Sequence, residues 1–129
     1  MSIEQDLYGH LSTYPALTAA QSDRVYPVGE VPDGVALPYT TYQRISGPRE
    51  RGLGRAPIAT RARFQLNVWA GSRLVALTVA AQLRAAVLTL TGTTVQVYDV
   101  DLDSDQDMYD DDTQTPGVSQ DVIILYEGS

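Results

Sequence analysis

The residues of this sequence with the most evident chemical potential are the aspartates of the segment DVDLDSDQDMYDDD, which places eight carboxylates in the fourteen positions 99–112. No lysine or arginine follows this run. Such a density of carboxylates is compatible with a calcium site, a mimic of DNA, a surface that faces a polyanion, or a solvated strand end. The surrounding residues favour some of these alternatives over others.

A calcium-binding loop between two helices needs a glycine at its sixth position and a glutamate at its twelfth. A loop that starts at Asp99 has Ser104 at the sixth position, and one that starts at Asp101 has Gln106 there. Alternating aspartates in a strand should all point to one side, which makes a row of carboxylates and not a cage. We therefore predict no metal site.

The sequence also argues against an enzyme. His10 is the single histidine, and its short predicted helix has no serine or carboxylate at the spacing of a catalytic triad. A partly buried or helix-capping histidine is the simpler interpretation. The segment GLGRAP, residues 52–57, lacks the preceding strand, third glycine and following helix of a dinucleotide-binding motif. We predict no catalysis and no cofactor.

Basic and acidic residues lie in different parts of the chain. Residues 44–63 contain six of the nine arginines and one acid, Glu50, whereas residues 99–127 contain ten acids and no base. All the cations are arginines, whose planar guanidinium suits interfaces, although a GC-rich genome explains an arginine-only composition equally well. The chain is therefore bipolar despite its net charge of −7.

Length and composition predict one globular domain over residues 1–129, with 43% hydrophobic and 19% charged residues. The absence of cysteine fits a reducing compartment such as a cytoplasm. The N-terminus has no apolar core region, and Gln82 and Arg84 interrupt the most apolar stretch, residues 74–90. We therefore expect neither a signal peptide nor a membrane span.

The first half of the chain predicts a helix followed by strands. Ile3, Leu7 and Leu11 recur every four residues and predict a helix over residues 3–13, which Pro15 should end. The predicted strands that follow cover residues 24–28, 38–46 and 58–70. The last of them alternates between a core face and a solvent-facing row, which comprise Ala62, Phe64, Leu66 and Val68, and Arg61, Arg63, Gln65 and Asn67, respectively. The last two strands should form an antiparallel hairpin around a long arginine-containing loop, residues 47–57.

The second half contains the main predicted helix, from the N-cap Ser72 to the stop at Gly92, and two further strands, residues 93–102 and 118–128. One apolar face of the helix should cover the sheet. The other face needs the first helix or another subunit as cover, and its residues are Leu74, Leu77, Ala81, Ala85 and Leu88.

The order of these elements shows no alternation of strands and helices, so we predict an α+β domain. Its sheet should be mostly antiparallel, with four to five strands packed against one long helix and a shorter N-terminal helix. The acidic run and TQTPG should separate the last two strands.

Several segments, in their order, resemble the tail terminator or tail-completion proteins of long-tailed bacteriophages: DLYGHL, DRVYP, LPYTTYQRISG, ATRARFQLNVWA, VAAQLRAAVLTLTG and DMYDDD…DVIILYEG. The resemblance covers residues 3–127. It implies a virion protein, made in the bacterial cytoplasm, that forms a ring, typically of six copies. The ring would cap the head-proximal end of the tail tube and join it to the head connector, and DNA would pass through without specific binding.

The sequence departs from that family in its density of aspartates and in Asp121, where a basic residue is common. Two sets of candidate residues follow from the resemblance together with the patterns above. The expected interface with another subunit or the tail tube comprises Arg49, Arg51, Arg55, Leu74, Leu77 and Leu88, and the expected lumen-facing acids are Asp103, Asp105 and Asp107. The alternative is a small acidic binding module, either a DNA mimic or a calcium-binding domain.

Overall fold

The computed structural model describes residues 3–46, 49–51, 57–91 and 95–127. Within these residues the chain forms three helices and six strands. Their bounds are α1 Ile3–Thr13, α2 Pro15–Gln21, β1 Val25–Pro27, β2 Tyr39–Ser46, β3 Arg49–Arg51, β4 Pro57–Trp69, α3 Arg73–Leu88, β5 Val97–Asp110 and β6 Thr115–Tyr126.

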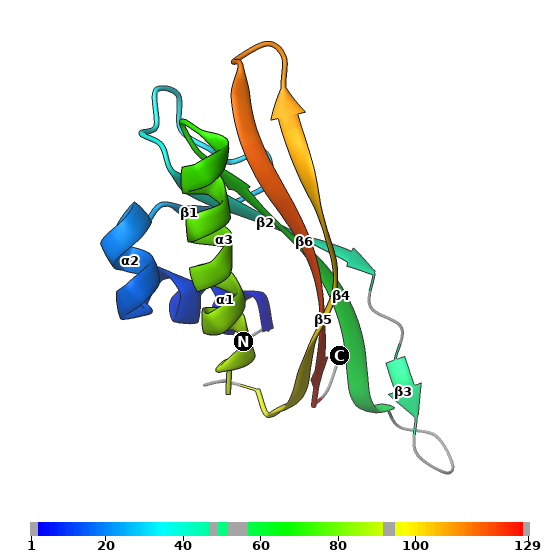
Figure 1. Ribbon diagram of the computed structural model, residues 1–129. Coiled ribbons are helices and arrows are strands. Elements are labelled where there is room, and N and C mark those ends of the chain that lie inside the picture. The colour runs from blue at the N-terminus through cyan, green and yellow to red at the C-terminus, as the bar shows by residue number, and fades with distance from the viewer. Residues whose placement is uncertain (1–2, 47–48, 52–56, 92–94, 128–129) are drawn as a thin grey trace.

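The strands form one sheet in the order β1-β2-β4-β6-β5, and β3 pairs with β4 beyond the end of β2. The helices cover one face of this sheet, and the opposite face carries no helix among the described residues (Figure 1). Four of the strand pairs are antiparallel, and only β1 and β2 run parallel. This arrangement confirms the predicted α+β fold with a mostly antiparallel sheet.

Two short elements were not predicted. Pro15 was expected to end the helical region, but it begins α2, because the first turn of a helix does not use the N–H that proline lacks. Residues 47–57 were predicted as a loop, yet Arg49 lies beside Thr60 in a short pairing of β3 with β4. This strand brings the count to six instead of the predicted four to five.

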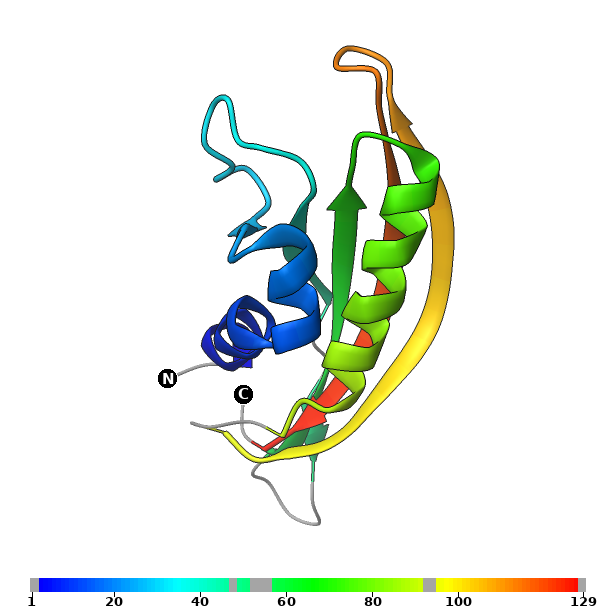
Figure 2. The same cartoon turned by 60° about the vertical axis from the view of Figure 1, so that its left-hand side comes forward.

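The core lies between β4, β6 and the inner face of α3. Strand β4 shows the predicted alternation, with Phe64, Leu66 and Val68 fully buried. The buried residues of α3 are Ala76, Val79, Ala80, Leu83, Ala86 and Val87, which form the apolar face that was expected to cover the sheet. Helices α1 and α2 pack beside α3 on the same face of the sheet (Figure 2).

The ends of α3 follow the prediction at one terminus only. The Ser72 side chain accepts a hydrogen bond from the Val75 N–H, as an N-cap does. At the other end the helix finishes at Leu88 with Thr89 as its C-cap, before the predicted stop at Gly92. Its 16 residues span about 24 Å. No helix among the described residues is long and apolar enough to cross a membrane.

The acidic run belongs to a strand and not to the predicted loop. β5 continues to Asp110, and the turn that follows joins it to β6 in a long hairpin that extends beyond the other strands (Figure 1). Near the base of this extension Gly117 lies beneath the Trp69 indole. A Cβ atom at Gly117 would lie 2.6 Å from the Val68 carbonyl oxygen, so only glycine fits there.

Candidate interaction surfaces

The pairing of β5 with β6 is irregular at Tyr98 and again at Asp103, and the second irregularity is a β-bulge that divides the acidic part of the strand in two. Leu102 pairs with Val122 of β6, but the next paired residue is Ser104, so Asp103 is an extra residue in the strand. Side chains of a strand alternate between the two faces, and one extra residue reverses the phase of that alternation. The bulge therefore changes the face to which every following side chain belongs.

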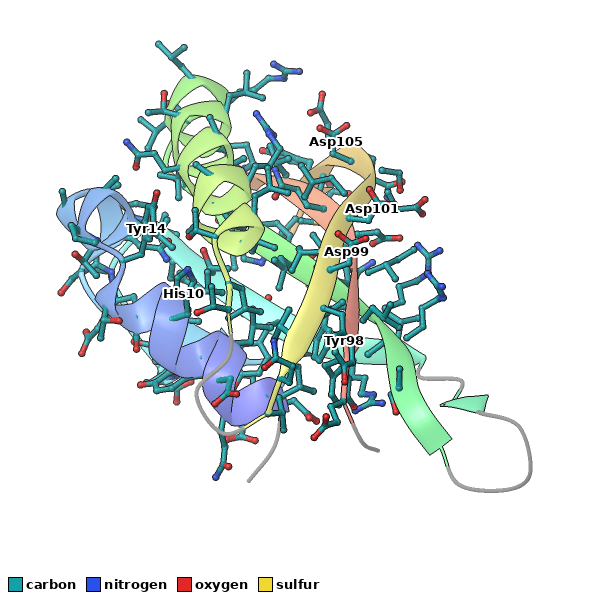
Figure 3. The ribbon with its side chains drawn as sticks, turned by 90° about the horizontal axis from the view of Figure 1, so that it is seen from below. His10, Tyr14, Tyr98, Asp99, Asp101 and Asp105 are labelled. Atoms are coloured by element: carbon teal, nitrogen blue, oxygen red, sulfur yellow. The ribbon has the colours of Figure 1, made fainter. Side chains whose placement is uncertain are left out.

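The bulge distributes the aspartates over both faces of the sheet. Before it, Asp99 and Asp101 are exposed on the uncovered face, opposite the partly buried Val100. After it, Asp105 and Asp107 fall on the face covered by α3. The prediction that the alternating aspartates all point one way is therefore wrong. Figure 3 shows Asp99, Asp101 and Asp105 along the outer strand of the sheet.

Arg63 of β4 binds two carboxylates on the uncovered face. Its guanidinium donates a hydrogen bond to Asp103, the bulge residue, and lies 3.5 Å from a carboxylate oxygen of Asp121. The hydrogen bond to Asp103, followed by the charges of Asp103 and Asp121, raises the pKa of the Arg63 guanidinium above its ordinary value. Asp121, the departure noted in the sequence, is thus the partner of a neighbouring arginine.

Two arginines of α3 pair with the aspartates beyond the bulge. Arg84 lies 3.7 Å from Asp105, and Arg73 donates a hydrogen bond of 2.7 Å to Asp107. These side chains are exposed, so each pair contributes little to stability. Their effect is to hold the carboxylates of β5 against the side of α3.

A cavity of about 240 Å³ lies at the bulge. Its walls come from α3, β5 and β6, and the residues that line it are Arg84, Leu102, Asp103, Ser104, Asp105, Gln120 and Asp121. Gln120 is 2% exposed, and its Nε2 donates to the Ala80 carbonyl at 3.2 Å. Its Oε1 is buried without a hydrogen-bond partner. Among the residues that the structure describes, no cluster of histidine or carboxylate side chains is arranged to hold a metal ion.

The outer face of α3 is apolar and has no cover within the described chain. Leu74, Leu77 and Leu88 are 75%, 38% and 53% exposed. They lie on the side of the helix opposite the core, and the exposed Ala81 and Ala85 continue the same stripe. The prediction that α3 has two apolar faces is therefore correct, and α1 does not cover the second one.

The opposite edge of the sheet is formed by β1, the end of β2, and β3. Arg44 of β2 lies 3.8 Å from Glu4 and 5.8 Å from the centre of the Tyr126 ring. Next to it, Ile45 is 46% exposed. Arg49 and Arg51 belong to β3, and Arg55 lies outside the described residues.

His10 has a structural position, as expected. Its Nε2 lies 2.7 Å from the Ala86 carbonyl oxygen and 3.0 Å from Thr89 Oγ1, at the C-terminal end of α3. The ring also contacts Tyr14 at a centroid distance of 5.7 Å (Figure 3). His10 therefore joins α1 to the end of α3, where the last carbonyl groups of a helix need donors.

The structure thus brings the predicted acids together with residues that the sequence did not suggest. Arg63 was recognised only as a member of the solvent-facing row of β4, and Arg73, Arg84 and Gln120 were not singled out. Their positions at the bulge depend on the register of β5, which no local pattern records.

Comparisons with known proteins add two findings. The family model of Tail completion protein gp17 matches residues 5–127. Among solved structures, a chain from the virion of the native gene transfer agent (GTA) particle superposes with a TM-score of 0.84 and 14% sequence identity, over 98% of this chain and 96% of that one. No curated protein matches the sequence. At this identity the structural likeness shows a shared fold alone.

Proposed function

The chain belongs to the family of Tail completion protein gp17, and from this membership we propose that its copies close into a ring at the head-proximal end of a tail tube. The family places the chain in the virion, as a structural protein of the tail. In our proposal the ring stops tube growth, presents its other side to the head connector, and leaves a lumen for DNA. A closed ring requires a heterologous contact, in which two different surfaces of each copy meet.

The observation that carries this proposal is the uncovered apolar face of α3. Monomeric proteins rarely expose a contiguous apolar stripe on one helix, and such a stripe marks an interaction site. Leu74, Leu77 and Leu88 form one, on a helix whose other face is fully engaged in the core. A neighbouring copy in the ring would remove these leucines from water.

We propose a structural role without catalysis. His10, the single histidine, is occupied at the end of α3, and the aspartates of β5 are paired with arginines or exposed to solvent. Catalytic carboxylates need different environments within an enclosed site. The exposed aspartates of β5 without an arginine partner, such as Asp99 and Asp101, are better suited to repulsion of phosphate groups at the rim of a lumen, within a screening length of about 8 Å.

The experiment that tests the ring is the replacement Leu77→Asp. The side chain is partly exposed on the outer face of α3, so the variant should fold with a melting temperature close to that of the original chain. It should remain monomeric in sedimentation velocity, and complementation with it should give tails of irregular length in electron micrographs.

Ala19→Asp is the matched control, because Ala19 is exposed on α2 and does not belong to the apolar stripe of α3. It should assemble as the original chain does. If Leu77→Asp assembles normally, the outer face of α3 is not an interface. If it unfolds the chain, Leu77 contributes to the core instead.

A further inference from the structure

The sheet has two edges with opposite charge. β5 pairs with β6 alone among the described strands, and its 14 residues include six aspartates and no base. At the other edge, β1 pairs with residues 40–42 of β2, so the end of β2 and the neighbouring β3 lie at the border of the sheet. This border contains Arg44, Arg49 and Arg51.

A long unpaired edge strand pairs readily with another strand unless the chain prevents it. The aspartates of β5 oppose pairing with a second β5, because like charges directly across two strands are unfavourable. The same carboxylates favour a strand that carries guanidinium groups. The β5 edge is therefore selective for a basic edge, and this chain contains one.

The cavity at the bulge is suited to bind a positively charged group that donates hydrogen bonds. Asp103, Asp105 and Asp121 carry three negative charges there, and the nearby Arg63 and Arg84 carry two positive charges, which leaves one carboxylate uncompensated. The Gln120 amide cannot turn over to satisfy its Oε1, because its Nε2 already donates to a carbonyl group. A guanidinium has five N–H donors and a positive charge, and so meets both needs.

Exposed apolar residues lie beside both edges, so the two edges are complementary in apolar surface as well as in charge. The Arg84 pair with Asp105 ties the flank of α3 to β5, and the leucine stripe of α3 lies next to that flank. At the basic edge, Ile45 and Tyr8 are 46% and 41% exposed. Each edge thus combines charges with exposed apolar side chains, as the core and rim of a protein interface do.

We propose that the β5 edge of one copy docks against the β2–β3 edge of the next copy, with an arginine of that edge in the cavity at the bulge. The contact rests on the proposed ring and specifies its geometry: the sheets of neighbouring copies lie edge to edge, and the leucines of α3 are covered by the apolar residues next to the basic edge. The two surfaces differ, so the contact can repeat around a ring.

Thiol crosslinking tests this arrangement, since the chain has no cysteine. Two variants are prepared, Ser104→Cys at the bulge of β5 and Ile45→Cys in β2, both at exposed positions. After mixing under assembly conditions, a short thiol crosslinker should join the two variants into a mixed dimer. Each variant alone should give little product. Ser104→Cys mixed with Ala19→Cys is the matched control and should give none.

Charge reversal then tests the role of the arginines. Arg49→Glu with Arg51→Glu, introduced into the Ile45→Cys chain, should abolish the mixed product, and rising salt should weaken it in the unreversed pair. A product from Ser104→Cys alone that equals the mixed one would show a symmetric contact and overturn the proposal. So would a mixed product that survives the charge reversal, or no mixed product at concentrations where rings form.

The outcomes distinguish a failure of the edge-to-edge contact from a failure of the proposed ring. If Leu77→Asp blocks assembly while the crosslinking and charge reversal give negative results, copies assemble through α3 by another contact, and only the edge-to-edge arrangement fails. If no rings are observed under any condition, the proposed function fails as well.

Discussion

Arg63, Arg73 and Arg84 each hold an aspartate of β5, although they come from two different elements. In the sequence the aspartates read as one row of free carboxylates on a strand end. The ion pairs reveal that part of the row is compensated within the chain, so the remaining negative charge is concentrated on residues such as Asp99 and Asp101. That distinction decides which carboxylates are available to another molecule.

The ionisation of three tyrosine side chains makes the stability of the fold vary with pH in the alkaline range. Burial raises the pKa of Tyr39 and Tyr42 above the ordinary value of 10.0, and a hydrogen bond to Glu127 raises the pKa of Tyr98. The folded chain therefore holds these protons more tightly than the unfolded chain. Their contribution to stability is fully present below about pH 10 and is lost as the pH rises through the folded-state values.

Urea denaturation between about pH 8 and about pH 11, together with tyrosinate absorbance, measures this effect. The free energy of unfolding should fall over the upper part of the range, and Tyr98→Phe should reduce the slope of that fall. A free energy of unfolding that stays constant or increases above pH 10 would contradict the assignment.

Among the elements, those with a repeating local pattern were predicted and those without one were not. The alternation in β4 and the N-cap at Ser72 each depend only on residues close together in the sequence, and both were confirmed. Helix α2 was not predicted, because Pro15 was interpreted only as the end of the first helix and it is also the first residue of the second. β3 has only three residues, too few for a pattern, and its pairing with β4 depends on the fold of the hairpin.

The candidate site shows the same division. The uncovered stripe on α3 follows from helical periodicity alone, and Leu74, Leu77 and Leu88 were identified from it. The bulge at Asp103 depends on how β5 aligns with β6, and the sequence contains no local signal for one extra residue. The cavity, its arginine partners and Gln120 were therefore beyond prediction.

Gly117 tests the packing of the hairpin against the sheet. In Gly117→Ala the new methyl group would lie 2.6 Å from the Val68 carbonyl oxygen and 2.8 Å from Trp69 Cε3. The carbonyl belongs to the backbone and cannot move without disturbing the pairing of β4 and β6. We expect the free energy of unfolding to fall by about 1–3 kcal/mol, measured by urea denaturation with circular dichroism.

Gly71→Ala is the control for that variant, because a Cβ at Gly71 meets nothing within 4 Å. It should leave the free energy of unfolding nearly unchanged. Equal stability of the two variants would show that the hairpin can shift to accept a side chain at position 117.

The whole molecule has an acidic edge, a basic edge and an apolar stripe beside the acidic one. Asymmetry of this kind suits head-to-tail association, in which each copy contributes a different surface to each of its two neighbours. The pairing of β5 carboxylates with arginines of β4 and α3 also keeps those arginines from binding other anions. In the proposed ring, through which DNA would pass, this second effect has a consequence that can be measured.

Replacing Asp103, Asp105 and Asp107 together with asparagine should make the chain bind duplex DNA, whether or not the variant still assembles. The change removes three negative charges, releases Arg73 and Arg84 from their partners, and leaves Arg63 with Asp121 alone. Freed arginines contact phosphates with an affinity that falls steeply with salt. Binding measured at two salt concentrations and the efficiency of DNA delivery report the effect.

The matched control replaces Asp110, Asp111 and Asp112 with asparagine, which changes the net charge equally but involves no described ion pair with an arginine. It should bind DNA less than the first variant does. Equal binding by both variants would mean that net charge alone matters, and no gain in either would return the acidic strand to the role of a solvated edge.

Trp69 is the single tryptophan of the chain, and its indole covers Gly117 where the β5–β6 hairpin leaves the rest of the sheet. Its fluorescence therefore reports on one place, without any label. A change of emission on mixing with a tail tube or a head connector would register contact or movement at the base of the hairpin. The chain thus carries its own optical probe, placed where the β5–β6 hairpin leaves the rest of the sheet.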